Sequence, residues 1–101
     1  MSTSPADLGS AMAQHVTVTE DAVIVDLPDG RTVVVPLPWH PRLAHGTPEE
    51  RANWRLIGRG EGIHWPDLDE DISVAGLLAG RASGETQSSL RRWLESRRGT
   101  G

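Results

Sequence analysis

Cysteine is absent from this 101-residue chain. Without thiols the chain can form no disulfide, no thiolate zinc site and no cysteine nucleophile. The absence suits the reducing environment of the cytoplasm, where structural disulfides are rare. A chain of this length forms one domain at most, with a modest core. Packing and hydrogen bonds must therefore supply the stability of the fold.

Long apolar stretches are also missing from the sequence. No run approaches the roughly 20 residues that a transmembrane helix requires. The first residues do not place a basic segment ahead of an apolar one, as a secretory signal does. We therefore expect a soluble, cytoplasmic protein that does not associate with membranes.

Positive charge is scarce and comes from one residue type. The formal net charge is −4, the ten basic residues are all arginine, and lysine does not occur. Proteins that bind nucleic acid generally present a basic surface, so this balance argues against such a function. The charge is unevenly spread, because residues 61–71 carry five carboxylates and no arginine. Residues 85–98 carry four arginines against two glutamates.

Three β-branched segments between residues 15 and 37 predict an antiparallel meander. Glu20-Asp21 fits a two-residue loop, and Leu27-Pro28-Asp29-Gly30 fits a type I turn with glycine in the left-handed conformation. Both turns set registers that bury the same apolar face. The predicted pairs are Val18 with Val23, Val16 with Val25, Val25 with Val33, and Val23 with Val35.

A short helix is predicted over residues 47–54. Thr47 is its candidate N-cap, Pro48 occupies the first helical position, and Glu50 completes a reciprocal capping box. The segment 37–43, which joins the meander to this helix, contains several prolines. Because proline does not suit a strand interior, we predict an extended connector there.

A second short helix is predicted over residues 73–80, with Ser73 as N-cap and Gly80 as its end. The chain between the two helices is apolar at intervals and rich in glycine. It is predicted to form two short strands or an extended segment, with the apolar residues Leu56, Ile57, Ile63 and Trp65.

The acidic segment contains Asp67, Asp69 and Asp71 at the spacing of the first half of a calcium loop. A complete loop needs glycine at its sixth position and glutamate at its twelfth, where this chain has Ile72 and Leu78. The alternative is a solvated turn whose carboxylates stabilise the N-terminal end of the following helix. The sequence favours the turn.

Three alternating glycines, Gly58, Gly60 and Gly62, precede that acidic segment. A phosphate-binding loop would place glycines between a strand and a helix start. Here a proline-bearing segment follows, and Glu61 would repel phosphate. We interpret the glycines as positions of unusual backbone angles or close packing.

Histidine and tryptophan give no catalytic pattern. No histidine lies in a recognisable nucleophile or zinc motif, so each is interpreted as a surface or half-buried residue. The tryptophans of the predicted domain should supply core volume, since the chain has no phenylalanine or tyrosine. We therefore name no catalytic, cofactor-binding or metal-binding residue and expect no cofactor. The residues considered are His15, His40, His45, His64, Trp39, Trp54 and Trp65.

A C-terminal helix is predicted over residues 85–98, with Leu90, Trp93 and Leu94 on one narrow apolar face. That face would dock on the chain's own sheet, on a second copy or on a partner, and a frayed, solvated tail is the alternative. Arginine and tryptophan are favoured at protein interfaces. The candidate partner-binding residues are Leu90, Arg91, Arg92, Trp93, Leu94, Arg97 and Arg98.

These elements give a predicted domain organisation and an α+β fold class. Residues 1–14 form a flexible segment, residues 15–80 form a single domain, and residues 81–101 form an extension that contains the helix. The domain is predicted to be a small antiparallel three-stranded meander packed by two short helices, with the C-terminal helix added to it.

Four motifs carry a family resemblance: Asp29-Gly30-Arg31, Trp39-x-Pro41-Arg42-Leu43, Arg51-x-x-Trp54 and Gly62-Ile63-His64-Trp65-Pro66-x-Leu68-Asp69-Glu70-Asp71-Ile72. Through them the chain resembles the bacterial domain of unknown function 2442 over roughly residues 15–80. That resemblance implies a small bacterial α+β protein with no established activity. Some members carry a helix-turn-helix domain after this module, for which the extension here is too short. Others lie beside a small companion, domain of unknown function 4160, in an arrangement like a toxin–antitoxin pair.

The function expected from these observations is a non-enzymatic protein-interaction module. It would be the antitoxin-like or adaptor member of a bacterial two-protein system. Its partner would be another protein or a second copy of the same chain. The alternative is a nucleic-acid-associated regulator that uses the C-terminal arginine helix. A third hypothesis, a small enzyme or metal protein, would use His64 with Asp67, Asp69 or Asp71.

Overall fold

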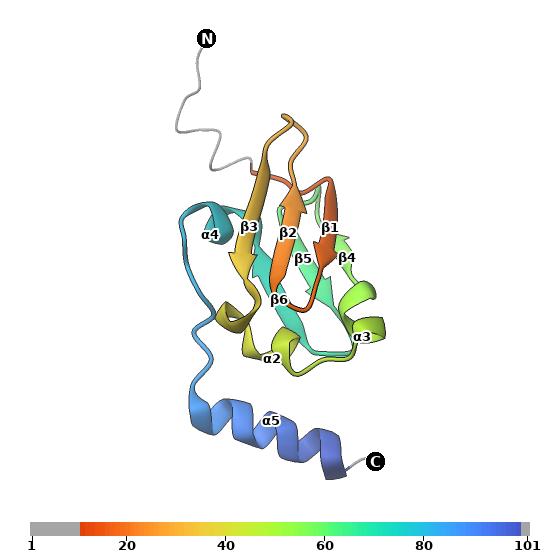
Figure 1. The fold of residues 1–101 in the computed structure, drawn as a ribbon, viewed down its shortest axis with the longest axis vertical. Helices are drawn as coiled ribbons and strands as arrows, with labels where there is room; N and C mark the ends of the chain where they lie inside the picture. The colour runs from red at the N-terminus through yellow and green to blue at the C-terminus, as the bar shows by residue number, and fades with distance from the viewer. Residues whose placement is uncertain (1–10, 100–101) are drawn as a thin grey trace.

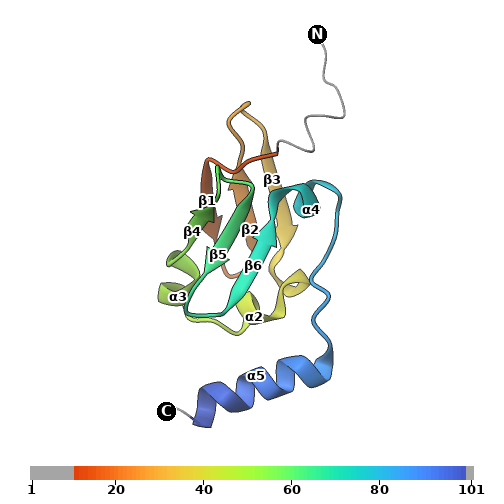
Figure 2. The same cartoon turned by 180° about the vertical axis from the view of Figure 1, so that it is seen from behind.

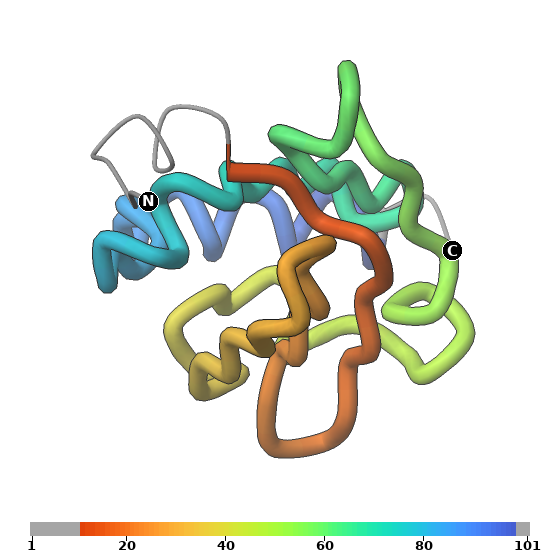
Figure 3. The backbone as a smooth tube through the Cα atoms, turned by 90° about the horizontal axis from the view of Figure 1, so that it is seen from above, coloured from red at the N-terminus to blue at the C-terminus, as the bar shows by residue number. Residues whose placement is uncertain are grey.

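Two three-stranded antiparallel sheets packed face to face form the body of the protein (Figure 1). The structure is a computed structural model, and it describes residues 11–99. Figure 3 shows the two layers from above, with red-to-yellow chain on one side and green-to-teal chain on the other. The first sheet contains β1 (His15–Val18), β2 (Ala22–Asp26) and β3 (Thr32–Pro36), and the second contains β4 (Arg55–Ile57), β5 (Gly62–Trp65) and β6 (Glu70–Ser73).

Short helices join and flank the two sheets. A 3₁₀ turn and two short α-helices connect β3 to β4 at one end of the body, and another short helix follows β6. The longest helix, at the C-terminus, lies across the end of the body below both sheets (Figure 2). The helical elements are η1 (Leu37–Trp39), α2 (Pro41–Ala44), α3 (Pro48–Ala52), α4 (Val74–Leu78) and α5 (Gln87–Gly99).

The first sheet confirms the predicted meander and its register. Val16 lies opposite Val25, and Val25 in turn lies opposite Val33, as expected from the two turns. Gly30 has a φ of +94° and donates its N–H to the Leu27 carbonyl at 3.1 Å. The turn chemistry therefore decided which face of the sheet is buried.

The second sheet is larger than the sequence indicated. In place of two short strands or an extended segment, three strands pair in the order β4-β5-β6. Each is only three or four residues long. Strands this short leave little periodicity in the sequence, so their pairing depends on the first sheet, which covers their apolar face.

The connector at residues 37–43 is helical rather than extended, which corrects the prediction. It forms η1 and α2, in which Pro38 is the second residue of η1 and Pro41 is the first residue of α2. A proline there loses no hydrogen bond, because the first N–H groups of a helix have no partner within it. The prolines therefore begin the helical turns and do not exclude them.

Both predicted helix caps are confirmed. In α3 the Thr47 side chain accepts from the Glu50 N–H at 3.1 Å, and the Glu50 carboxylate accepts from the Thr47 N–H at 2.9 Å. In α4 the Ser73 hydroxyl oxygen accepts from the Gly76 N–H at 2.8 Å. Gly80, with a φ of +76°, follows the end of that helix. Local polar bonding therefore sets where both helices begin.

The acidic segment was predicted to be a turn that leads directly into a helix, but in the structure it leads into a strand. Asp67 and Asp69 lie in the turn of the β5–β6 hairpin, while Glu70 and Asp71 belong to β6. Helix α4 begins only at Val74, so these carboxylates do not lie at its N-terminal end. The pairing of β5 with β6 converts this stretch into a hairpin.

The core lies between the sheets and is centred on Trp65, which is fully buried. Its indole N–H donates to the Arg51 carbonyl at 2.9 Å, so the one polar atom of this side chain is satisfied. Trp39 and Trp54 are half-buried and pack against the edge of the core. Thus all three tryptophans contribute to packing, but only Trp65 fills the centre.

The packed chain begins before position 15. Ala11 and Ala13 are buried, and the Ala13 N–H donates to the Gly60 carbonyl at 2.8 Å. Residues 1–10 of the segment predicted to be flexible lie outside the described residues. Gly60 has a φ of +104°, and a Cβ there would lie 2.8 Å from the Ala13 carbonyl oxygen. The glycines were predicted to allow close packing, and Gly60 does so.

Within residues 11–99, no helix combines the length and the apolar character needed to cross a lipid bilayer.

We expect Gly60→Ala to lower the free energy of unfolding by about 2–4 kcal/mol, because backbone strain adds to a steric clash. Gly30→Ala should cost only the strain, about 1–2 kcal/mol, since a Cβ there meets no atom within 4 Å. Gly84→Ala, which has open space and no positive φ, is the matched control. Urea denaturation of the three variants tests this order, and equal midpoints for Gly60→Ala and Gly84→Ala would contradict it.

Candidate protein-interaction helix

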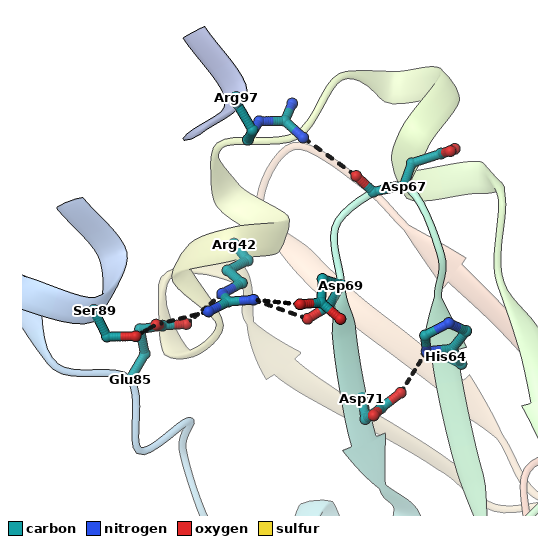
Figure 4. A network of polar contacts seen from close by, with 8 residues as sticks. All are labelled: Arg42, His64, Asp67, Asp69, Asp71, Glu85, Ser89 and Arg97. Atoms are coloured by element: carbon teal, nitrogen blue, oxygen red, sulfur yellow. Dashed lines mark hydrogen bonds and ion pairs between the residues drawn. The ribbon is translucent and has the colours of Figure 1, made fainter. Parts of the chain in front are cut away.

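Helix α5 and the residues before it are held against the body by the Arg42 side chain of α2, the Glu50 side chain of α3 and a backbone carbonyl of the β5–β6 turn. Figure 4 shows the first and the last of these contacts. The helix begins at Gln87, two residues later than predicted, and Thr86 caps it. The Thr86 hydroxyl oxygen accepts from the Ser89 N–H at 3.1 Å. Glu85, predicted to be helical, lies just outside, where its carboxylate bonds to the body.

Arg42 on α2 is the central contact between the body and the α5 region. Its guanidinium donates to both carboxylate oxygens of Glu85, at 2.6 and 3.2 Å. It also donates to the Asp69 carbonyl at 3.0 Å and approaches the Asp69 carboxylate at 3.4 Å. The Ser89 hydroxyl donates to Glu85 at 2.5 Å. One half-buried guanidinium therefore joins α2, the β5–β6 turn and the start of α5.

Trp93 lies beside two guanidinium groups. Arg42 is 5.1 Å and Arg97 is 4.7 Å from the centroid of its ring, both within the range of cation–π attraction. Arg97 also donates to Glu50 on α3 at 2.9 and 3.2 Å and to the Asp67 carbonyl at 3.2 Å. The Trp93 side chain also packs against the hydrophobic core of the body. Of the three docking surfaces considered from the sequence, the described structure shows the chain's own body.

The candidate partner-binding residues separate into two sets. Leu90, Trp93, Leu94 and Arg97 are half-buried on the side of α5 that meets the body. Arg91, Arg92 and Arg98 are exposed, and none of these three forms an ion pair or side-chain hydrogen bond with the described residues. The helix therefore anchors through one side and presents arginine on the other.

Sequence reasoning missed the groups of the body that hold the helix. They are Arg42, Glu50, Asp67 and Asp69, together with Glu85 at the approach to α5. The available signal was the opposite charge of residues 61–71 and 85–98. These two segments meet in space, since the β5–β6 turn contacts Arg97 (Figure 4).

The remaining acidic-segment residues form local pairs. His64 and Asp71, on neighbouring strands, are 2.5 Å apart between Nδ1 and Oδ1, and the Asn53 amide donates to Asp67 at 2.9 Å. Among residues 11–99 no group of three or more histidine, aspartate or glutamate side chains is arranged to hold a metal ion. His64 therefore pairs with Asp71, one of the three aspartates considered with it for a metal site. The described residues supply no third ligand to this pair.

His40 differs from the prediction that every histidine is exposed or half-buried, because it is only 4% exposed. Its Nδ1 lies 3.4 Å from the carboxylate of Glu70, which is also buried. No sequence pattern links these positions, since η1 and β6 meet only in the folded chain.

Charged partners shift the ionisation of the groups that hold α5. The Arg42 hydrogen bond holds the pKa of Glu85 below its usual range, against the opposing effect of burial. For Glu50, burial would raise the pKa, but the Thr47 N–H and Arg97 together lower it. The bond to Glu85 in turn raises the pKa of Arg42. All three shifts favour the charged forms that hold the helix.

The paired sheets and short helices define a small α+β module, as predicted from the sequence. The chain belongs to the family described as Protein of unknown function (DUF2442), whose model matches residues 13–83. The resemblance noted from the sequence motifs is thereby confirmed. The match ends before Glu85, so it covers the two sheets and the short helices and does not include α5.

Two solved structures are similar to this chain. A protein of unknown function from Rhodospirillum rubrum is 30% identical, with a TM-score of 0.63, and the match covers 77% of this chain and 94% of that chain. An uncharacterized protein from Chromobacterium violaceum is 20% identical, with a TM-score of 0.65, and the match covers 86% of this chain and 80% of that chain. The second likeness shows the fold alone. No curated protein matches the sequence.

Trp93→Ala is expected to loosen α5, because it removes two cation–π contacts and half-buried packing worth about 1–2 kcal/mol in total. Backbone order parameters from ¹⁵N relaxation should fall across residues 87–99 and stay unchanged in the two sheets. Arg92→Ala, at an exposed position on the same helix, is the control. A rigid helix in the Trp93 variant would show that other contacts hold it.

Acid is expected to release α5 before the sheets unfold. Glu85 and Glu50 have a lower pKa in the folded protein, so their contribution is complete above the ordinary carboxyl pKa of about 4.3. It is lost as the pH falls through the lowered folded values. Amide chemical shifts of α5, followed from pH 7 down to about pH 3 with core methyl signals as reference, measure this release. Unchanged α5 shifts over that range would contradict it, and Glu85→Gln should weaken docking already at pH 7.

Proposed function

We propose that this protein is a non-enzymatic protein-interaction module that presents an arginine-bearing helix face to an acidic partner protein. The observation that carries the proposal is the division of α5 into two sides. Its inner side is anchored through Trp93 and Arg97, while Arg91, Arg92 and Arg98 remain exposed. A helix held in this way presents three cations in a constant arrangement.

Anchoring the helix favours binding for a thermodynamic reason. A segment that is already helical and docked loses less conformational entropy on association than a free tail does. Arginine also suits this role, since its planar guanidinium forms paired hydrogen bonds with carboxylates and is enriched at interface hot spots. The expected partner surface therefore carries aspartate and glutamate at its centre.

The finer proposal is that the protein is the adaptor or antitoxin-like member of a bacterial two-protein system in the cytoplasm. Its support is the resemblance to family members that lie beside a small companion, together with a chain that lacks cysteine. The anchors differ from those expected from the sequence, because Trp93 contacts its own body. Partner contacts are accordingly assigned to the exposed arginines first, with Leu90 and Leu94 at their margin.

A nucleic-acid-associated regulator is the second candidate, because exposed arginines without carboxylate partners also suit phosphate. The net charge of −4 weighs against it. Such binding would decrease steeply with salt and disappear from a nuclease-treated sample. These two properties separate it from recognition of an acidic protein.

The test is affinity capture of the tagged full chain from its native lysate, with and without nuclease, read by mass spectrometry. We expect one stoichiometric, nuclease-resistant partner, and a reduction of about tenfold or more in its recovery with Arg91→Glu/Arg92→Glu, because reversed charges repel an acidic surface. Arg55→Glu/Arg59→Glu makes the same charge change at exposed positions on and beside β4 and should leave recovery unchanged.

Equal recovery with both double variants would contradict the proposed helix face. Partners that vanish with nuclease would support the regulator instead.

A further inference from the structure

The C-terminal helix is joined to the body by a linker, residues 79–86, between the end of α4 and the start of α5. All linker residues except Ser83 and Glu85 are exposed. The linker backbone meets the body where the Ser83 N–H donates to the Trp39 carbonyl at 2.9 Å. The family match ends at residue 83, inside this linker. The helix is therefore an addition to the family module, and an exposed linker tethers it.

The surface that α5 covers carries opposite charges at its two ends. Near the start of the helix, the Arg42 guanidinium donates to the Glu85 carboxylate at 2.6 Å. Near the end of the helix, the Glu50 carboxylate accepts from Arg97 at 2.9 Å. Trp93 lies beside both guanidinium groups. Because reversing the helix would place like charges together, the surface accepts this sequence in one direction only.

These contacts do not depend on whether the helix and the body belong to the same chain. A second copy carries the same helix with the same charges, so its α5 fits the surface with identical contacts. The linker reaches about 26–29 Å when fully extended, which exceeds the 24 Å width of the molecule. A reciprocal exchange leaves no surface unfilled, because each copy gives and receives a helix around a two-fold axis.

We propose that α5 docks on the body of a second copy as well as on its own, so that two chains exchange helices and form a two-fold dimer. Each body then receives Glu85, Trp93 and Arg97 from its partner. The dimer brings two sets of the exposed arginines of α5 into one particle. The exchange uses only the inner side of the helix, so it does not depend on the proposed binding of an acidic partner protein.

Exchange competes with docking inside one chain. A short flexible tether holds the helix at an effective concentration on the order of 1 mM. The unmodified chain is therefore monomeric at micromolar concentrations and forms the exchanged dimer only as its concentration approaches that value. A change that prevents docking within a chain, but permits it between two chains, should move the dimer into the micromolar range.

The experiment mixes two full-length variants, Arg42→Glu and Glu85→Arg. Within either chain the altered residue repels its former partner. In an exchanged pair, the new glutamate of one chain meets the new arginine of the other, and the unchanged Arg42 and Glu85 also meet. Sedimentation velocity should show a species of twice the mass in the equimolar mixture, at a concentration about tenfold or more below that at which either variant dimerises alone. Backbone order parameters of residues 87–99 should recover in the mixture.

A second pair of variants, Glu50→Arg and Arg97→Glu, repeats the test at the other end of the helix. Core methyl signals retained in each single variant show that the body is folded, and the second pair decides the matter if Arg42→Glu unfolds it. The control mixture is Arg92→Glu with Glu20→Arg, which makes the same charge changes at exposed positions and should dimerise no more readily than the unmodified chain.

Two results would overturn the exchange. One is that folded variants of either pair stay monomeric when mixed. The other is a mixed dimer in which residues 87–99 remain disordered, because such a dimer would use a different surface. The measurement needs only the purified chain, so its failure is distinct from a failure to capture an acidic partner.

Discussion

The two sheets depend on each other, because each covers the apolar face of the other. A three-stranded sheet of strands this short cannot bury a face alone, so neither sheet is stable without its partner. Trp65 occupies the centre of the shared interior and replaces the phenylalanine and tyrosine that the chain lacks. Its bond to the Arg51 carbonyl also ties α3 to this centre. The short helices then close the open end of the paired sheets.

Polar contacts have a different role from the core, since they attach the C-terminal helix to a body that is already packed. Arg42 forms bonds to Glu85 and Asp69 while lying beside Trp93, so one side chain couples three segments. Such an attachment is electrostatic and therefore sensitive to pH and salt, whereas the apolar interior is much less so. The protein thus combines a stable body with a helix whose attachment depends on conditions.

The exposed arginines of α5 and the buried His40 differ in what it costs to leave each without a partner. On α5, exposed arginines lack carboxylate partners, but water solvates them, so the fold loses little by displaying them. Beside β6, the two ring nitrogens of the buried His40 form no hydrogen bond with the described residues, although Nδ1 lies 3.4 Å from the Glu70 carboxylate. Only the buried nitrogens cost stability, because they lose their hydrogen bonds to water without replacing them.

Local chemistry made much of the fold predictable. Turn residues set the register of the first sheet, and side-chain caps at Thr47 and Ser73 began two helices, because these interactions join residues a few positions apart. The amphipathic pattern likewise predicted α5. Tertiary structure alone decided the second sheet, the helical turns at Pro38 and Pro41, and the meeting of His40 with Glu70. Those features depend on contacts between segments distant in sequence, and such contacts leave no periodic signal in the chain.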